Sequence, residues 1–170
     1  TDVPRSHPFY KVVETMLHRG VTSGCGSGNY CPGNTVSRAQ MAPFLLRALE
    51  GPEYTPPACE GVFSDVVCPS AFADWIEELF DRGVTGGCQT DPLSYCPGTA
   101  VNRAQMSVFL LTALEGPGYT PPDCSGVFGD VACPSTFANW IEDLAARGIT
   151  TGCGGGNFCP GGVVARSQMA

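Results

Sequence analysis

Apolar residues recur with helical spacing in three separate stretches of the chain. In the clearest stretch the spacing is i, i+3, i+4 and i+7, which is typical of one face of a helix, and the residues are Phe72, Trp75, Ile76 and Leu79. Gly83 follows at the place where a left-handed C-terminal cap would lie. The pattern therefore predicts an amphipathic helix that ends at this glycine.

The other two stretches repeat this arrangement. Towards the C-terminus the apolar positions are Phe137, Trp140, Ile141 and Leu144, followed by Gly148. Near the N-terminus they are Phe9, Val12, Val13 and either Met16 or Leu17, followed by Gly20. We expect three helices with matching apolar faces, of which the first has valine where the others have tryptophan.

A second helix is predicted downstream of each of these. Ser37 with Gln40, and Asn102 with Gln105, have the spacing of an N-cap residue and its reciprocal partner at N3. The apolar stripes expected behind them are Met41, Phe44, Leu45, Ala48 and Leu49, and Met106, Phe109, Leu110, Ala113 and Leu114. In the last copy Ala165 has no capping side chain, so a weaker helix start is expected there. Pro43 lacks a backbone N–H and predicts a local distortion.

Alignment of the chain with itself shows that these helix pairs are repeats. Residues 64–88 match residues 129–153 without a gap, and residues 1–25 match residues 64–88. The downstream halves, which begin with Cys-Pro-Gly, recur in the same order. We therefore predict three repeats within one structural body: residues 1–58, residues 59–123 and residues 124–170, the last of them incomplete.

The fold class predicted from this pattern is mostly α, with three helix-loop-helix units. A unit of two helices buries too little apolar surface to be stable alone, so neighbouring units must pack together. The connectors "EGPEYTPPAC" and "EGPGYTPPDC" are nearly identical, which indicates the same path between successive units. We expect a closed body with pseudo-threefold symmetry, and an open, filamentous solenoid is the alternative.

The repeats also pair the ten cysteines. Each repeat has two cysteines that flank a polar loop, and the second and third repeats have a further pair at their entry. The predicted disulfides are Cys25–Cys31, Cys88–Cys96, Cys153–Cys159, Cys59–Cys68 and Cys124–Cys133. Zinc is the competing interpretation, but there is no C-x2-C motif and the chain has only two histidines. Five disulfides indicate an extracellular, cell-surface or periplasmic location.

Composition excludes several classes of function. The net charge of −7 and the nine scattered basic residues leave no basic stripe for nucleic acid. No apolar run approaches the roughly 20 residues of a membrane helix. The first residues lack the features of a signal peptide, so we expect a soluble mature segment, cut from a longer polypeptide.

The order of the motifs resembles three tandem S-layer homology modules. The family pattern has an opening F-x-D-V, a first helix with a central aromatic residue, a G-[IV]-x-x-G turn and a T-R-A-E at the second helix. This chain has "FSDV" and "FGDV", the turns "GVTSG", "GVTGG" and "GITTG", and then "SRAQ", "NRAQ" and "ARSQ". The resemblance covers essentially all 170 residues, although the cysteines are not part of the usual pattern and indicate a divergent, disulfide-bearing branch.

The resemblance implies noncovalent anchoring. Such triplets fold as a pseudo-trimer whose grooves bind cell-wall or envelope polysaccharide, often through a pyruvylated sugar that meets the motif arginine. Carried over by position, the groove residues are Arg38, Arg103, Arg166, Gln40, Gln105 and Gln168, with Trp75 and Trp140 as candidates for stacking on a sugar. Glutamine in place of the family's glutamate removes a negative charge beside each arginine, which frees it for an anion.

The same residues have alternative interpretations. The arginines could pack at the helix start or pair with Asp65 or Asp130, and the tryptophans could belong to the core. Asp2, Asp65 and Asp130 could bind nearby backbone N–H groups as turn or cap residues. The polar loops hold too few carboxylates for calcium. We therefore expect neither a metal nor a cofactor.

Two functions are left. No activated nucleophile, phosphate-binding loop or catalytic carboxylate pair is apparent. Glu77 and Glu78 are adjacent in sequence, so on a helix their side chains point in different directions and cannot act as such a pair. We therefore expect no enzymatic activity. The leading hypothesis is a noncatalytic surface anchor that holds a larger parent polypeptide to an envelope polysaccharide. The alternative is a structural subunit of a surface layer, sheath or appendage, in which other copies of the protein fill the grooves.

Overall fold

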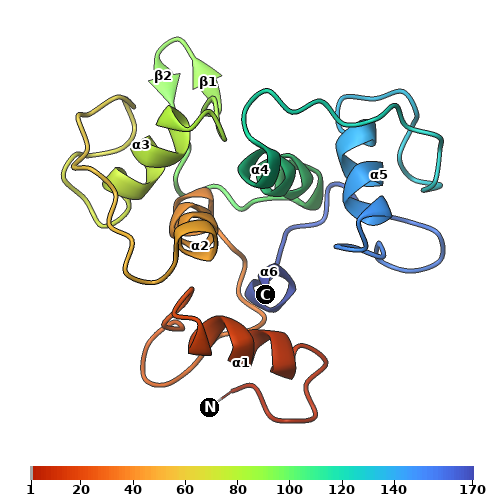
Figure 1. The fold of residues 1–170 in the computed structure, drawn as a ribbon, viewed down its shortest axis with the longest axis horizontal. Coiled ribbons are helices and arrows are strands. Elements are labelled where there is room, and N and C mark those ends of the chain that lie inside the picture. The colour runs from red at the N-terminus through yellow and green to blue at the C-terminus, as the bar shows by residue number, and fades with distance from the viewer. Residues whose placement is uncertain (1) are drawn as a thin grey trace. The chain divides into compact units, whose positions relative to one another are not determined.

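The computed structural model describes residues 2–170 and is mostly helical, as predicted (Figure 1). The first helices of the repeats are α1 (Tyr10–His18), α3 (Ala73–Asp81) and α5 (Ala138–Ala146). The second helices are α2 (Arg38–Glu50), α4 (Arg103–Glu115) and α6 (Arg166–Met169). A short antiparallel hairpin, β1 (Gln89–Thr90) with β2 (Leu93–Ser94), lies in the second polar loop, for which the sequence predicted no strand.

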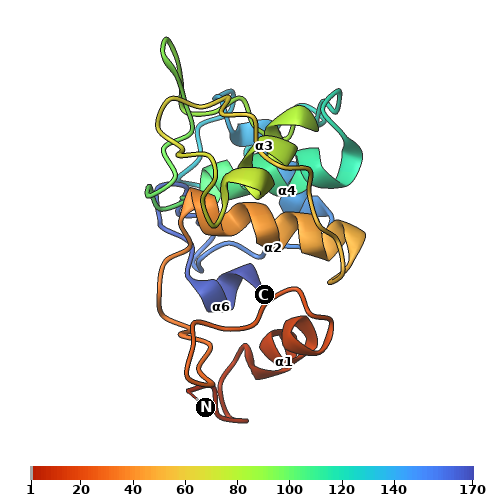
Figure 2. The same cartoon turned by 90° about the vertical axis from the view of Figure 1, so that its left-hand side faces the viewer.

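The chain divides into two compact units. The first comprises residues 1–100 together with residues 164–170, and the second comprises residues 101–163. In the first unit the C-terminal helix α6 lies beside α1 and α2 (Figures 1 and 2). These units do not coincide with the predicted repeats, so the division into repeats 1–58, 59–123 and 124–170 and their pseudo-threefold arrangement stay predictions.

The first helix of each repeat ends as the sequence predicted. In α3, Gly83 has a φ of +67° and donates its N–H to the Phe80 carbonyl, while Val84 donates to Leu79. These two hydrogen bonds form a Schellman motif, which satisfies carbonyls that a helix end otherwise leaves unpaired. Gly20 and Gly148 adopt the same left-handed conformation after α1 and α5.

The second helices have the predicted capping boxes. In α2 the Ser37 hydroxyl accepts from the Gln40 N–H and the Gln40 side chain accepts from the Ser37 N–H, and α4 has the same exchange between Asn102 and Gln105. Ala165 makes no side-chain cap, and α6 is only four residues long. The distortion expected at Pro43 does not interrupt α2, which is helical from Arg38 to Glu50.

The buried surface of these second helices is wider than the predicted stripe. Met41, Phe44 and Leu45 are buried as expected, but Leu49 is 40% exposed. Leu46, which lies outside the predicted stripe, is fully buried. In α4, Leu114 of the predicted stripe is 55% exposed, whereas Leu111, which lies outside the stripe, is fully buried. Neighbouring elements therefore surround the first turns of each helix on more than one side, while the last turn meets solvent.

All five predicted disulfides are present. Their sulfur pairs are Cys25–Cys31, Cys59–Cys68, Cys88–Cys96, Cys124–Cys133 and Cys153–Cys159. Each closes a short loop, and the structure contains no free cysteine among residues 2–170. No helix in this range is long and apolar enough to cross a membrane.

Arg82, directly after α3, holds in place the connector that runs from α2 to α3. Arg82 forms ion pairs with Glu78 in its own helix and with Glu50 at the end of α2. It also donates to the hydroxyl of Tyr54, which in turn donates to Glu78. In the second unit Arg147 makes the corresponding contacts with Asp143, Glu115 and Tyr119. The similar sequences of the two connectors therefore correspond to the same set of contacts.

A buried glutamate on each of the helices α3 and α5 holds the chain segment that enters the repeat. Glu142 accepts hydrogen bonds from the backbone N–H groups of residues 125–127 at 2.6–2.9 Å. Glu77 accepts in the same way from residues 60–62. Burial alone would raise the pKa of Glu142, but these hydrogen bonds, with the one from Ser125 the strongest, outweigh burial and lower it.

We expect Glu142→Gln to reduce the free energy of unfolding at pH 7 by about 1–2 kcal/mol, because an amide is a weaker acceptor and brings a donor towards other donors. The folded-state pKa of Glu142 lies below its unfolded value near 4.5, so its contribution is complete above that pH and is lost as the pH falls through the folded value. Urea denaturation from pH 7 to pH 3 measures both effects.

The exposed Glu53 provides the matched control. Glu53→Gln removes the same charge at a position that makes none of these hydrogen bonds, and its stability should follow that of the parent at every pH. A difference between Glu142→Gln and the parent that does not shrink as the pH approaches 3 would contradict this account of Glu142.

Candidate functional site

The arginine that begins each second helix folds onto an aromatic residue far away in the sequence. Arg38, at the start of α2, is 5% exposed, and its Nε donates to the main-chain carbonyl of Tyr95 at 2.7 Å. Its guanidinium carbon lies 4.7 Å from the centre of the Tyr95 ring, which is a cation–π distance. Burial lowers the pKa of Arg38, and Tyr95 opposes this change. The cation is thus held inside the protein by a carbonyl and a ring.

The same contact occurs twice more. Arg103 donates to the Phe158 carbonyl at 2.8 Å and lies 4.6 Å from the ring centre. Arg166 donates to the Tyr30 carbonyl at 2.8 Å and lies 4.9 Å from that ring centre. In each case the arginine comes from one predicted repeat and the aromatic residue from the next, with the third repeat followed by the first.

A threonine completes each arginine contact. The second terminal nitrogen of Arg38 lies 3.4 Å from the Thr85 hydroxyl, which also accepts from the Gly87 N–H. Thr22 and Thr150 occupy the same position beside Arg166 and Arg103. In the G-[IV]-x-x-G pattern this position of the glycine turn can hold any residue. The signal that could have identified it is that all three turns have threonine there.

The backbone N–H groups at the start of α2 are all used by the protein. Arg38 and Ala39 donate to the carbonyls of Thr99 and Pro97 in the next repeat. The capping box within Ser37–Gln40 satisfies the other two donors. In the other repeats the N–H groups of Arg103, Ala104, Arg166 and Ser167 donate to the carbonyls of Gly162, Pro160, Asn34 and Pro32. An anion would therefore have to meet side chains, because these helix starts offer it no free backbone donor.

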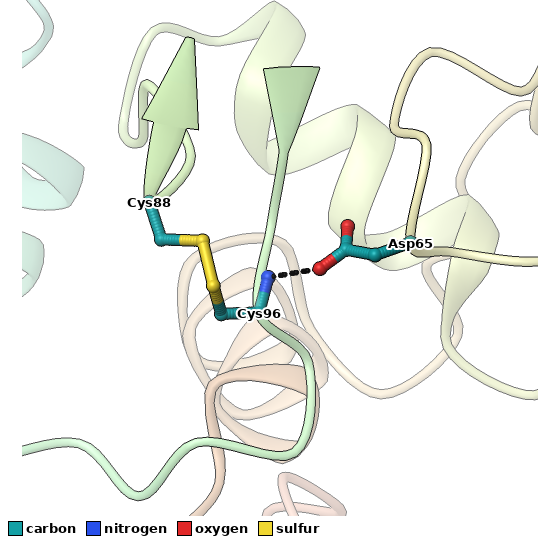
Figure 3. Close-up of side chains that lie close together, drawn as sticks. All are labelled: Asp65, Cys88 and Cys96. Atoms are coloured by element: carbon teal, nitrogen blue, oxygen red, sulfur yellow. Dashed lines mark hydrogen bonds between the residues drawn. A yellow bond between two sulfur atoms is a disulfide. The ribbon is translucent and has the colours of Figure 1, made fainter. Parts of the chain in front are cut away.

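An aspartate holds the aromatic residue of each contact from the other side. The two carboxylate oxygens of Asp65 accept from the N–H groups of Tyr95 and Cys96, each at 2.7 Å, and Figure 3 shows the bond to Cys96 beside the Cys88–Cys96 disulfide. This confirms that the aspartate binds backbone N–H groups, but its partners lie 30 residues away and are not in a local turn.

The equivalent aspartates are Asp2 and Asp130. Backbone hydrogen bonds, first those from Tyr30 and Phe158 respectively, lower the pKa of both carboxyl groups. The clusters Asp65–Cys88–Cys96 and Asp130–Cys153–Cys159 bring carboxylate and sulfur atoms close together, but their sulfurs are joined in disulfides and their carboxylates are occupied. The arrangement braces a loop and does not present thiolate ligands to a metal.

The hydroxyl of the aromatic residue differs between the copies. The Tyr95 hydroxyl donates to the Arg38 carbonyl at 2.9 Å, and Tyr30 does the same to Arg166 at 2.6 Å. Burial raises the pKa of Tyr95 to about 12, which keeps this donor protonated. The third copy has Phe158, whose ring is in the same place but has no hydroxyl.

A cavity of about 200 Å³ lies in the first unit next to one of these arginines. Two arginines line it, Arg166 and Arg47. Its remaining lining combines small polar groups with apolar ones: Val21, Thr22, Ser23, Gly24, Gln40, Pro43, Phe44 and Phe72. No carboxylate lines the cavity, although the chain is acidic overall. The cavity is therefore suited to an anionic or a polar ligand.

The predicted tryptophans are half-buried. The Trp75 ring packs edge-on against Tyr54, and the Arg47 guanidinium carbon lies 4.8 Å from its centre. Trp140 makes the matching edge contact with Tyr119. Each ring is therefore partly committed to packing. Among the predicted glutamines, Gln40 borders the cavity, Gln105 is half-buried in its capping box and Gln168 is exposed.

Comparison with known proteins agrees with the motif order. Residues 1–42 match the family model of the S-layer homology domain. The matched segment includes Asp2, Tyr30 and Arg38, so it contains one aspartate, one aromatic residue and one arginine of the repeated contacts.

Three relatives align with almost the whole chain. An exoglucanase from Acetivibrio thermocellus and an amylopullulanase from Thermoanaerobacterium thermosulfurigenes are each 28% identical over 94% of the chain. A surface-layer 125 kDa protein from Lysinibacillus sphaericus is 26% identical over 94%. The aligned region is 14%, 8% and 13% of these relatives, so the chain spans about a tenth of their length.

The tyrosine hydroxyls predict a measurable difference in stability. We expect Tyr95→Phe to lower the free energy of unfolding by about 1 kcal/mol, because it removes one buried hydrogen bond and keeps the ring under Arg38. Phe158→Tyr should raise it by about 0.5–1 kcal/mol, since the new hydroxyl can donate to the Arg103 carbonyl as the other copies do. Urea denaturation measures both changes. Destabilisation by Phe158→Tyr would show that the third contact lacks room for this bond.

Proposed function

We propose that this chain is a noncatalytic module that anchors a larger protein at the bacterial cell surface by binding envelope polysaccharide. Two of its relatives are named as enzymes with different activities and a third as a surface-layer protein. The alignment covers a small part of each, so the shared region is better explained by a common location than by a common reaction. The disulfides fit an extracellular position.

We further propose that the three repeats close into a body with pseudo-threefold symmetry. The support is the order of the arginine contacts: Arg38 binds the aromatic residue of the second repeat, Arg103 that of the third, and Arg166 that of the first. An open solenoid would leave the last arginine without a partner in the chain. The backbone bonds at the helix starts follow the same cyclic order.

In this proposal the grooves between repeats hold the polysaccharide, and the observation that carries it is the carboxylate-free cavity beside Arg166. The Nε of Arg166 donates to the Tyr30 carbonyl, and one terminal nitrogen makes a long contact, 3.4 Å, to the Thr22 hydroxyl. Other donors of its guanidinium group are therefore proposed to bind the ligand. Arg38 and Arg103 are proposed as the corresponding groove residues by position, with Gln40, Gln105, Gln168, Trp75 and Trp140 as neighbouring contacts. No cofactor is required.

The alternative function is a structural role in a surface layer, sheath or appendage, with protein in the grooves. The observation in its favour is the similarity to a surface-layer protein. In this case the cavity beside Arg166 would accept a side chain from another copy or from the parent polypeptide. The two functions differ in whether an isolated polysaccharide binds to the protein in a saturable way.

Calorimetric titration with purified cell-wall polysaccharide tests the proposal. We expect saturable binding by the parent protein. Binding should be at least tenfold weaker in Arg166→Lys, because lysine keeps the charge but loses the planar fork. Arginine-to-alanine variants are unsuitable here because Arg38 and Arg166 are buried and hold the loops in place. Arg147→Lys, at an exposed ion pair, is the control and should bind like the parent.

A second variant separates binding from folding. Ser23 borders the cavity and is exposed, so Ser23→Tyr obstructs the cavity without disturbing the buried contacts. It should melt at the parent temperature and bind at least tenfold more weakly. Absence of saturable binding by the parent, together with self-association in electron micrographs, would reject polysaccharide anchoring in favour of the structural role.

A further inference from the structure

The first repeat contains a second cavity, of about 130 Å³, which is lined by α1 and by the loop that ends in Tyr30. No lysine or arginine of residues 2–170 lines it, so it differs in kind from the cavity beside Arg166. Glu14 borders it. Its apolar walls come from four residues, Val3, Val13, Leu17 and Tyr30. Such a cavity suits a ligand that combines an apolar group with hydrogen-bond donors.

In the other two repeats a phenylalanine ring occupies the corresponding place. Phe63 is 3% exposed, and its ring centre lies 5.4 Å from that of Tyr95, the counterpart of Tyr30. Phe128 is 7% exposed, and its ring centre lies 5.4 Å from that of Phe158. Rings at this separation stabilise each other beyond their burial. The first repeat thus has a cavity where its counterparts have a buried aromatic pair.

The glycine turn shows the same difference between the repeats. A β-carbon at Gly87 would lie 3.2 Å from the Phe63 ring, and the third repeat has the same contact at 3.0 Å. At Gly24, the counterpart in the first repeat, the three nearest atoms all belong to the backbone of Asn29 and Tyr30. The space beside Gly24 therefore corresponds to the space that a ring fills in the other two repeats.

The glutamate beside this cavity is bound differently from its two counterparts. Glu77 and Glu142 are at most 9% exposed, and each binds three successive backbone N–H groups just before the buried phenylalanine. Glu14 aligns with Glu77 at an offset of 63, but its side chain is 40% exposed. Among residues 2–170 the partner of its carboxylate is the exposed His18 ring, at 3.6 Å. Glu14 is therefore accessible to backbone donors of a peptide.

The segments bound by Glu77 and Glu142 share a short sequence. They are Glu-Gly-Val-Phe at residues 60–63 and Ser-Gly-Val-Phe at residues 125–128. The glycine has a φ of +85° in the first and +84° in the second, a left-handed conformation that glycine adopts without strain. Such a conformation lets successive N–H groups converge on one anionic group. The protein itself thus contains two examples of a Gly-Val-Phe segment bound at this kind of site.

We propose that the cavity of the first repeat is a docking site for a segment of the Gly-Val-Phe type that belongs to the larger parent polypeptide. The phenylalanine ring enters the cavity beside Leu17 and Tyr30, and Glu14 binds the N–H groups of the three residues before it. The existence of a parent polypeptide rests on the proposed anchoring function, whereas the docking chemistry does not. Docking fixes the first repeat to the protein that it anchors.

Titration of the peptide acetyl-Glu-Gly-Val-Phe-amide into the ¹⁵N-labelled protein tests the site by NMR. We expect saturable shifts of the Glu14 and Tyr30 backbone signals, with a dissociation constant on the order of 1 mM. A peptide with alanine in place of phenylalanine should bind at least about tenfold more weakly, because it leaves the apolar walls exposed. Glu14→Gln should weaken binding of the phenylalanine peptide roughly fivefold, since hydrogen bonds to a charged acceptor are the stronger ones. Equal binding of the two peptides would overturn the proposal.

The matched control is Glu53→Gln, which removes the same charge from an exposed position outside the cavity and should bind the peptide like the parent. Glu14 does not line the cavity beside Arg166, so Glu14→Gln should also bind polysaccharide like the parent. Failure of polysaccharide binding would therefore reject anchoring and leave the docking site standing.

A tethered version decides the case in which the free peptide is too weak to saturate the site. The same four residues are added before Thr1, which places the phenylalanine two positions before Asp2, as Phe63 precedes Asp65. A short tether raises the effective concentration to the millimolar range. The extended protein should melt at least about 3 °C above one that carries alanine in place of the added phenylalanine. Glu14→Gln should remove part of that difference, and equal melting of the two extended proteins would overturn the docking site.

Discussion

The hydrogen bond from a buried arginine Nε to the main-chain carbonyl of a distant loop is the contact on which this structure depends. It occurs three times, at Arg38, Arg103 and Arg166. Each loop is already fixed by an aspartate and a disulfide, so the carbonyl has a defined position. A buried cation is tolerated only when its donors are satisfied and its charge is balanced. The carbonyl, the threonine and the aromatic ring meet part of that requirement and thereby tie a helix start to a remote loop.

These structural contacts limit what the motif arginine can offer a ligand in the proposed anchoring function. In Arg166 the Nε and the ring contact serve the fold, so the ligand of the proposed function would have to meet the terminal nitrogens. The helix starts add little, because the carbonyls of the next loop and the capping box occupy their N–H groups.

The acidic residues of the chain are mostly used within the fold. Asp65 and its equivalents bind backbone N–H groups, Glu77 and Glu142 hold the entering segments, and Glu78 and Asp143 pair with arginines near the connectors. These carboxylates replace apolar packing in loops that are too short and polar to bury a large core. The short disulfide loops serve the same purpose, since they restrict the polar segments that the helices cannot cover.

The mostly helical class, the disulfide pairs, the glycine C-caps and the capping boxes were all predictable from local sequence patterns and their repetition along the chain. All of these depend on residues within about nine positions of each other, so spacing and residue type suffice. The position of Glu142, the threonine beside each arginine, the burial of Leu46 and the cavity beside Glu14 were decided by the tertiary structure. The partners of Arg38 lie 47 and 57 residues away, and no local pattern encodes which carbonyl or hydroxyl a folded chain will bring to a side chain.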